Sequence, residues 1–190
     1  MKLEGAYLTV AMTLAVTQMA LADNPTAYTL AKTGDQYVGV QSKDRVVQIR
    51  SEKSINSEYP NIWYVDYYDP DATLKAVEVK FGGGAEMEVS HPGRLIEMAT
   101  DAHKPFDATL LKVDSDQAIQ IATSQPLLKD LYVTGTQLEL DHGEIGPVWH
   151  VKLWASRDKN YNENVDIGEI VLSATDGSIV KNDLHPNSLN

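Results

Sequence analysis

Two similar aromatic segments constrain this chain more than any other feature. "PNIWYV" spans residues 60–65 and "GPVWHV" spans 146–151, which puts Trp63 and Trp149 at matching places. Runs of aromatic and β-branched residues are typical of strands. A glycine-bearing hairpin and then a His-Pro pair follow each segment. The pattern predicts an internal repeat, while the shared turn chemistry of hairpins leaves coincidence open as the alternative.

The spacing of this repeat differs between its two copies. The tryptophans are 149 − 63 = 86 residues apart, whereas His91 and His185 are 185 − 91 = 94 apart, so the second copy holds eight more residues. The polar stretch "DKNYNENVDIGE", residues 158–169, has only the short segment 69–73 as its counterpart. We therefore interpret this stretch as a lengthened connection between two strands.

One helix is well marked, at the start of the second half of the chain. Asp114 is a suitable N-cap, and Gln117 three residues later completes a capping box. An apolar pattern follows, and Pro126 ends or kinks the segment. With strand signals dominating from Tyr37 onward, the expected fold class is α+β, a helix packed on an antiparallel β-sheet.

The N-terminus has the pattern of an export signal. An apolar run from Ala6 closes with Ala20-Leu21-Ala22, an A-x-A cleavage pattern, so residues 1–22 are expected to be a signal peptide and 23–36 a flexible lead-in. An uncleaved membrane anchor is the alternative. The chain has no cysteine, which excludes disulfides, and the periplasm or secretion is the expected destination. After cleavage, stable insertion in a membrane is not expected.

Three motifs in the second half resemble the PepSY-type domain, a small module of exported proteins. These are the alanine-rich helix "DSDQAIQIATSQPLL", the aromatic strand "PVWHVKLWA" and the closing hairpin "EIVLSATDGSIV". The hairpin departs from the family pattern, because Ser173 stands where the family has Asp and Asp176 where it has Thr. The resemblance implies tandem PepSY-like repeats, a first, degenerate one at 37–106 and a second at 107–190. It also implies a non-catalytic module. Some domains of this type inhibit or chaperone proteases.

Motifs for catalysis and for phosphate binding are absent from the sequence. The five histidines do not form an H-E-x-x-H pattern, there is no G-x-S-x-G, and Gly82-Gly83-Gly84 lacks the Lys and Ser/Thr of a phosphate loop. A net charge of −11 argues against a nucleic-acid partner. We therefore expect no enzyme activity and no cofactor.

Alternation along the two aromatic strands separates core from surface candidates. Trp63, Val65 and Tyr67 share one face, as do their counterparts around Trp149, and these faces are expected to form the core. The opposite faces offer four amphipathic side chains as candidates for partner binding, although packing within the protein is the alternative. These candidates are Tyr64, Tyr68, His150 and Trp154.

The stretch 158–169 also resembles a calcium loop by the spacing of its oxygen donors. The metal-ligand candidates are Asp158, Asn160, Asn162, Asp166 and Glu169. An EF-hand requires Gly at the sixth place and helices on both sides, whereas Glu163 occupies that place and both flanks have strand character. A non-helical calcium loop and a solvated turn are the two remaining interpretations.

Together these features predict an exported, non-catalytic PepSY-like module that holds a peptide or protein partner. The alternative is a periplasmic protease inhibitor or modulator that acts through its loops, in which case the partner is a protease. The sequence leaves the oligomeric state open.

Overall fold

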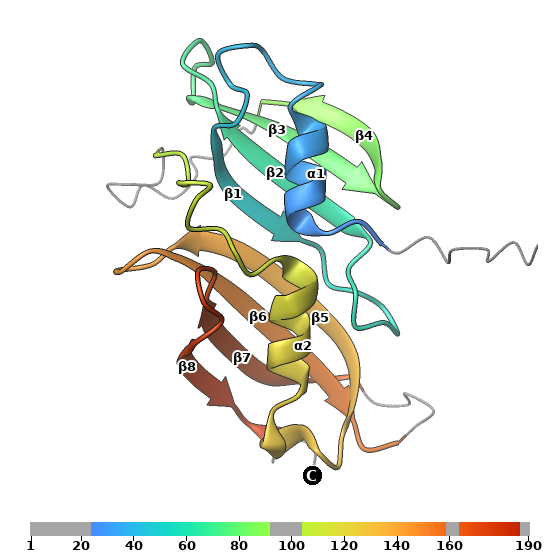
Figure 1. Ribbon diagram of the computed structural model, residues 1–190. Coiled ribbons are helices and arrows are strands. Elements are labelled where there is room, and N and C mark those ends of the chain that lie inside the picture. Colours follow the sequence, from blue (N-terminus) through green and yellow to red (C-terminus); the bar gives the residue numbers. More distant parts are fainter. Residues whose placement is uncertain (1–23, 92–103, 159–163, 187–190) are drawn as a thin grey trace, which may run out of the picture.

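The computed structural model describes residues 24–91, 104–158 and 164–186 and contains one eight-stranded antiparallel sheet (Figure 1). Strands hold 42% of the described residues and helices 14%. The helices are α1 (Ala27–Gly34), α2 (Ser115–Thr123) and the short 3-10 helix η1 (Pro126–Leu128). The strands are β1 (Val46–Ser51), β2 (Ile62–Tyr68), β3 (Ala76–Gly82), β4 (Ala85–Ser90), β5 (Tyr132–His142), β6 (Pro147–Ser156), β7 (Val165–Ser173) and β8 (Ile179–Leu184).

The fold is β-rich, so the predicted α+β class, with tandem PepSY-like repeats of a helix on a sheet, is wrong. The two α-helices have only eight and nine residues, whereas β5 and β6 have eleven and ten. The well-formed capping box at Asp114 led the sequence analysis to overweight the helix. A capping box marks where a helix begins but does not determine how long it runs.

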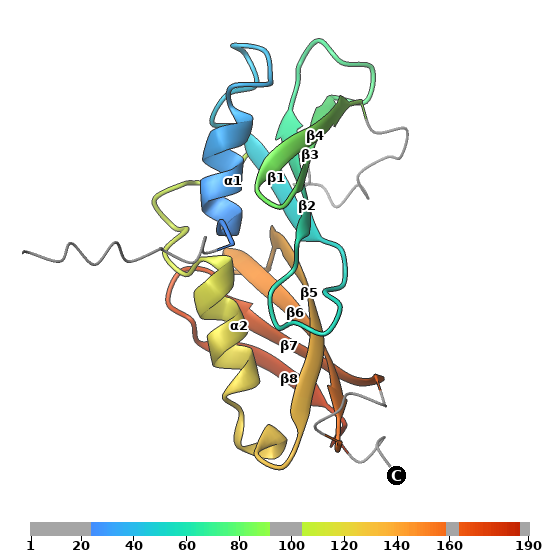
Figure 2. The ribbon, with the colours of Figure 1, turned by 90° about the vertical axis from the view of Figure 1, so that its right-hand side faces the viewer.

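Each half of the chain has a helix followed by four strands in a meander. The sheet order is β4-β3-β2-β1-β5-β6-β7-β8, so the two meanders join along β1 and β5. Both helices lie on the same face of the sheet (Figure 2). Neither is long and apolar enough to span a bilayer, as far as the described residues extend.

Helix α1 lies within residues 23–36, where the sequence analysis expected a flexible lead-in. The sequence holds the N-cap and the apolar pattern of this helix, but the pattern extends over only eight residues. Thr26 is the N-cap, and its side chain accepts the backbone N–H of Thr29. Leu30 and Ala31 are buried against the sheet with Ala27, the i, i+3, i+4 pattern of an amphipathic helix. The expected signal peptide, 1–22, lies outside the described residues.

The predicted lengthened connection between strands is wrong. The β6–β7 connection spans residues 157–164 and the β2–β3 connection spans 69–75, which are nearly equal lengths. Of the eight extra residues, two lie in β6 after Trp149, two in β7, three in the β7–β8 turn and one in the β6–β7 connection. The extra length is therefore divided between longer strands and a longer closing turn.

The core lies between the helices and the sheet, as strand alternation predicts. Trp63 and Trp149 both point to the helix side and are buried. Trp149 donates its Nε1–H to the carbonyl of Val113 at 2.8 Å and stacks on Tyr28 with ring centroids 5.9 Å apart. Tyr67 reaches α1 and donates its hydroxyl to the carbonyl of Ala31 at 2.5 Å. Burial raises the pKa of the Tyr67 hydroxyl, so it stays a donor.

The seam between the two halves has a short ladder. Only Ile49–Leu140 and Arg50–Glu139 pair across β1 and β5. Beyond them, Ser51 Oγ accepts the N–H of Leu138 at 2.9 Å. Further along, Ser54 Oγ accepts the N–H of Thr136 at 2.7 Å. Serine hydroxyls therefore replace part of the backbone ladder at the centre of the sheet.

Candidate functional site

The sheet face opposite the helices, which we call the open face, carries mostly polar and charged side chains. One row of mutually paired residues crosses all eight strands of this face. In order from β4 to β8, its members are Glu88, Lys80, Tyr64, Arg50, Glu139, His150, Val171 and Lys181. Opposite charges therefore lie side by side at two places in the row, Glu88 beside Lys80 and Arg50 beside Glu139.

All four predicted binding residues lie on the open face, and all four are half-buried. They do not form one cluster. Tyr64 and Tyr68 come from β2, His150 and Trp154 come from β6, and strands β1 and β5 lie between them. Three strand spacings separate Tyr64 from His150, which is about 14 Å. The structure therefore offers two separate pairs of candidates rather than a single aromatic site.

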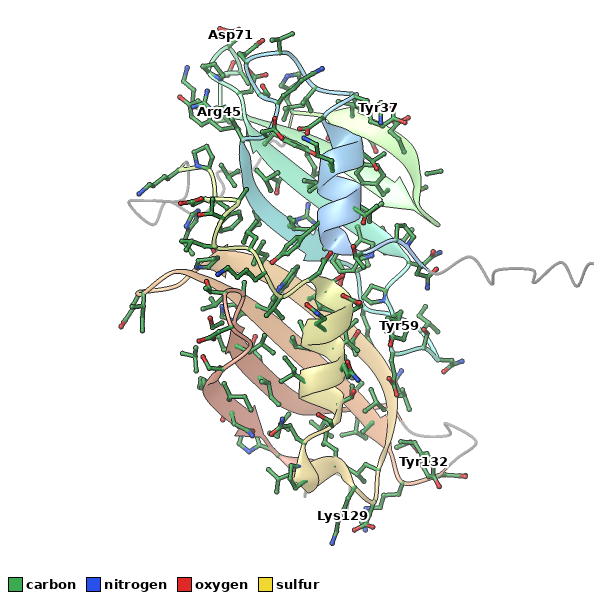
Figure 3. The ribbon with its side chains drawn as sticks, in the orientation of Figure 1. Tyr37, Arg45, Tyr59, Asp71, Lys129 and Tyr132 are labelled. Atoms are coloured by element: carbon green, nitrogen blue, oxygen red, sulfur yellow. The ribbon has the colours of Figure 1, made fainter. Side chains whose placement is uncertain are left out.

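Cationic side chains cover the three aromatic candidates. Arg50 Cζ lies 3.9 Å from the ring centroid of Tyr64 and Lys53 Nζ lies 4.2 Å from that of Trp154. Arg45 Cζ lies 4.2 Å from the centroid of Tyr68. These are cation–π contacts within the chain. Figure 3 shows Arg45 at the end of the first half that lies away from α2.

Carboxylates complete this network. Arg50 pairs with Glu78 and lies between it and Tyr64, whose hydroxyl donates to Glu52 Oε1 at 2.6 Å. The Arg50–Glu78 pair is more buried than the Lys152–Asp166 pair, so solvent screens it less, while taking its charges out of water costs more. The rings of Tyr64 and Tyr68 consequently serve the sheet's own packing.

The metal-ligand candidates have other partners in the structure. Asp166 Oδ2 pairs with Lys152 Nζ at 2.9 Å, and Asp166 Oδ1 accepts the N–H of Gly168 at 3.0 Å. Glu169 Oε1 contacts His150 Nδ1 at 3.1 Å. The backbone N–H of Asp158 donates to Ser156 Oγ.

Two of the metal-ligand candidates, Asn160 and Asn162, lie outside the described residues. Within 24–91, 104–158 and 164–186, no three His, Asp or Glu side chains converge to hold a metal ion. The flanking elements are strands β6 and β7, as the sequence analysis predicted, and the helices of an EF-hand are not there.

The second half of the open face is hollowed at the end where the β5–β6 turn and the β7–β8 hairpin meet. This groove has a volume of about 610 Å³, and Val148, His150 and Val171 form its floor. Ile145, at the tip of the β5–β6 turn, is 97% exposed, and Val180 of β8 is 58% exposed. Both side chains line the groove, so its rim as well as its floor is partly aliphatic.

Of this groove, the sequence analysis identified only His150. The signal it missed is Ile145 in "HGEIGP", an apolar residue in a turn whose neighbours are glycine and glutamate. Turns favour Gly, Pro, Asn, Asp and Ser for backbone reasons, so an exposed isoleucine there is not explained by turn formation.

No known protein family, characterised protein or solved structure matches this chain.

Proposed function

We propose that this protein is an exported, non-catalytic binding module that holds a peptide or protein partner in the groove of its second half. The observation that carries the proposal is the aliphatic lining of the groove, with Val148 and Val171 in its floor and Ile145 on its rim. Desolvating such side chains favours association at about 25 cal/mol per Å² of apolar surface buried. Export is proposed from the N-terminal sequence, and the lack of catalysis from the catalytic motifs that the sequence lacks.

The groove is a better candidate than the aromatic region of the first half. There, the cationic groups of Arg50 and Lys80 lie over the ring of Tyr64. A partner would have to displace both side chains to contact that ring. In the groove, His150 is the only one of the four predicted residues that lines the hollow. Its ring is 36% exposed on a strand, which leaves it accessible beside the aliphatic floor.

Charge favours a basic partner. The chain carries a net charge of −11, and the described lining of the groove has two carboxylates, Glu144 and Asp176, against one lysine, Lys181. A hydrogen bond from the Ser178 hydroxyl lowers the pKa of Asp176 and keeps this carboxylate charged. Complementary charge raises the rate of encounter and discriminates against acidic partners. The partner proposed is therefore a segment that combines aliphatic side chains with Lys or Arg.

Panning a random peptide library against the full chain tests this function. The expected result is enrichment of peptides that join Val, Ile or Leu to basic residues, with binding lost in Ile145→Asp. Ile55→Asp is the matched control, because Ile55 is 79% exposed on the β1–β2 loop and does not line the groove. Enriched peptides that bind Ile145→Asp and the unsubstituted chain equally would overturn the proposal, as would a library that yields no enrichment.

A further inference from the structure

Strand β8 ends the sheet on one side, and among the described residues no strand lies beside the backbone groups of its outer edge (Figure 1). His185 donates its N–H inward, to the carbonyl of Ile167 in β7. Because N–H and C=O groups alternate in direction along a strand, those of Asn182 and Leu184 point outward. An exposed edge of this kind is a template for pairing with another strand.

At one position of this edge, a side chain accepts a hydrogen bond that a neighbouring strand would otherwise accept. Asn182 Oδ1 accepts the outward N–H of Leu184 at 3.3 Å. This bond lies within β8 and is long for an N–H···O bond. A carbonyl from a paired strand would satisfy the same N–H with better geometry.

The charged residues of β8 are spaced so that two copies of this strand are complementary to one another. Lys181 and Asp183 lie two residues apart, both on the open face, opposite Val171 and Glu169 of β7, and within one chain they pair with each other at 2.9 Å. Their side chains are 59% and 46% exposed. In an antiparallel pair centred on Asn182, each Lys181 faces Asp183 of the second copy, and each Asp183 faces Lys181 of the second copy. Opposite charges at facing positions stabilise antiparallel pairs.

The other edge of the sheet lacks this arrangement. Strand β4 has the sequence "AEMEVS", with two glutamates and no basic residue. Pairing β4 with a second β4 would therefore bring together only negative or neutral side chains. The two edges of the sheet are chemically different, and only the β8 edge complements itself.

We propose that two copies of this chain associate through β8, in an antiparallel pair about a twofold axis at Asn182. The contact is isologous and closed, because each β8 edge is used once. Six-residue strands bury little surface, so the dimer is weak and depends on concentration. The proposal does not depend on the proposed function, since the groove is formed within one chain.

Sedimentation velocity of the full chain across a concentration series tests this dimer with four sequences. The unsubstituted chain is expected to sediment faster as its concentration rises. Lys181→Asp or Asp183→Lys should abolish this rise, because each single change places like charges opposite one another twice. The double variant Lys181→Asp/Asp183→Lys should restore it, because the exchanged charges again face opposite partners.

Asn182→Pro supplies a second test. Proline removes an N–H that points outward, which an edge strand tolerates, yet it blocks the central hydrogen bonds of the proposed pair. We expect a folded monomer at every concentration, with circular dichroism as the check on folding. The proposal is overturned if the unsubstituted chain shows no concentration dependence, if the single variants associate as it does, or if the folded double variant stays monomeric.

Discussion

The backbone N–H of Tyr28, in the first turn of α1, donates to Asp114 Oδ1 at 3.1 Å, and the same oxygen accepts the N–H of Ser115 in α2. One carboxylate therefore caps both helices. Ser115 Oγ in turn accepts the N–H of Ala27 at 2.9 Å. The two helices meet N-terminus to N-terminus, and a negative charge at that point also suits both helix dipoles.

Removal of this shared cap is expected to destabilise the whole protein. Asp114→Ala should lower the free energy of unfolding by about 2 kcal/mol, the upper part of the range for a single cap, because orphan N–H groups appear on two helices. Urea denaturation measures the loss. Asp116→Ala is the control, since Asp116 lies in the same turn but is exposed and outside the cap. Equal losses in the two variants would contradict the shared role of Asp114.

Gly34 is required by a close approach rather than by its backbone angles. A Cβ at this position would lie 2.1 Å from Tyr67 Oη. Alanine normally stabilises a helix relative to glycine, yet here we expect Gly34→Ala to destabilise by about 1–3 kcal/mol through overpacking.

Tyr67→Phe removes the hydroxyl that a methyl at residue 34 would strike. Gly34→Ala should therefore cost less in a Tyr67→Phe background, and a double-mutant cycle by thermal or chemical denaturation measures the difference. An additive cycle would show that the clash is relieved elsewhere.

The pH dependence of stability should include a contribution from Asp166. Burial disfavours its charge, but hydrogen bonds from Lys152 and the N–H of Gly168 outweigh burial and lower its pKa below the usual 3.8. The unfolded chain then binds the proton more tightly than the folded one. The stability from this group is therefore present above about pH 4 and is lost as the pH falls through the folded pKa.

Asp166→Asn isolates that contribution. Its denaturation midpoint should fall less than that of the unsubstituted chain between pH 6 and pH 3. The effect is modest, because both partners of the ion pair are nearly half exposed and solvent screens them. Parallel pH profiles for the two proteins would count against the ion pair.

Lys53 attaches the β1–β2 loop to the second half, and tryptophan fluorescence should report it. Its Nζ lies over Trp154 and donates to Asn164 Oδ1 at 2.9 Å. Lys53→Met is expected to raise quenching by acrylamide, because Trp154 is half-buried whereas Trp63 and Trp149 are buried. The loss of stability should be about 0.5–1 kcal/mol.

Lys129→Met serves as the control for Lys53→Met. Lys129 lies beside η1 at the far end of the second half (Figure 3) and pairs weakly with Asp130 at 3.9 Å. Its replacement should leave the quenching unchanged. An unchanged signal in Lys53→Met as well would mean that Lys53 does not shield the ring.

Local patterns predicted part of this fold well. The capping box of Asp114 and Gln117 is confirmed. It could be predicted because both of its hydrogen bonds join residues only three apart in the sequence. Alternation also separated the two faces of β2 and β6 correctly, since it depends only on the pleat. Helix α1 was missed because its eight residues form too short a periodic segment beside Pro25 and Gly34.

Long-range relationships were not readable from one sequence. Nothing local indicates that β1 and β5 lie between Tyr64 and His150, so the separation of the candidate residues comes only from the sheet order. The groove is likewise formed where the β5–β6 turn and the β7–β8 hairpin meet, and Ile145 was the only local feature of the sequence that indicated it. The loop interpretation was wrong because a length difference between repeats does not say which elements hold it.

The short ladder between β1 and β5 has a consequence for how the protein opens. In most sheets the edge strands yield first, since central strands have partners on both sides. Here the amide protons of Leu138 and Thr136 are held by the hydroxyl oxygens of Ser51 and Ser54, and a change of side-chain rotamer releases them without separating two strands. We expect these two amides to take up deuterium sooner than the amides that β5 donates to β6. The hydrogen bonds within each meander would then stay formed while those between β1 and β5 open transiently.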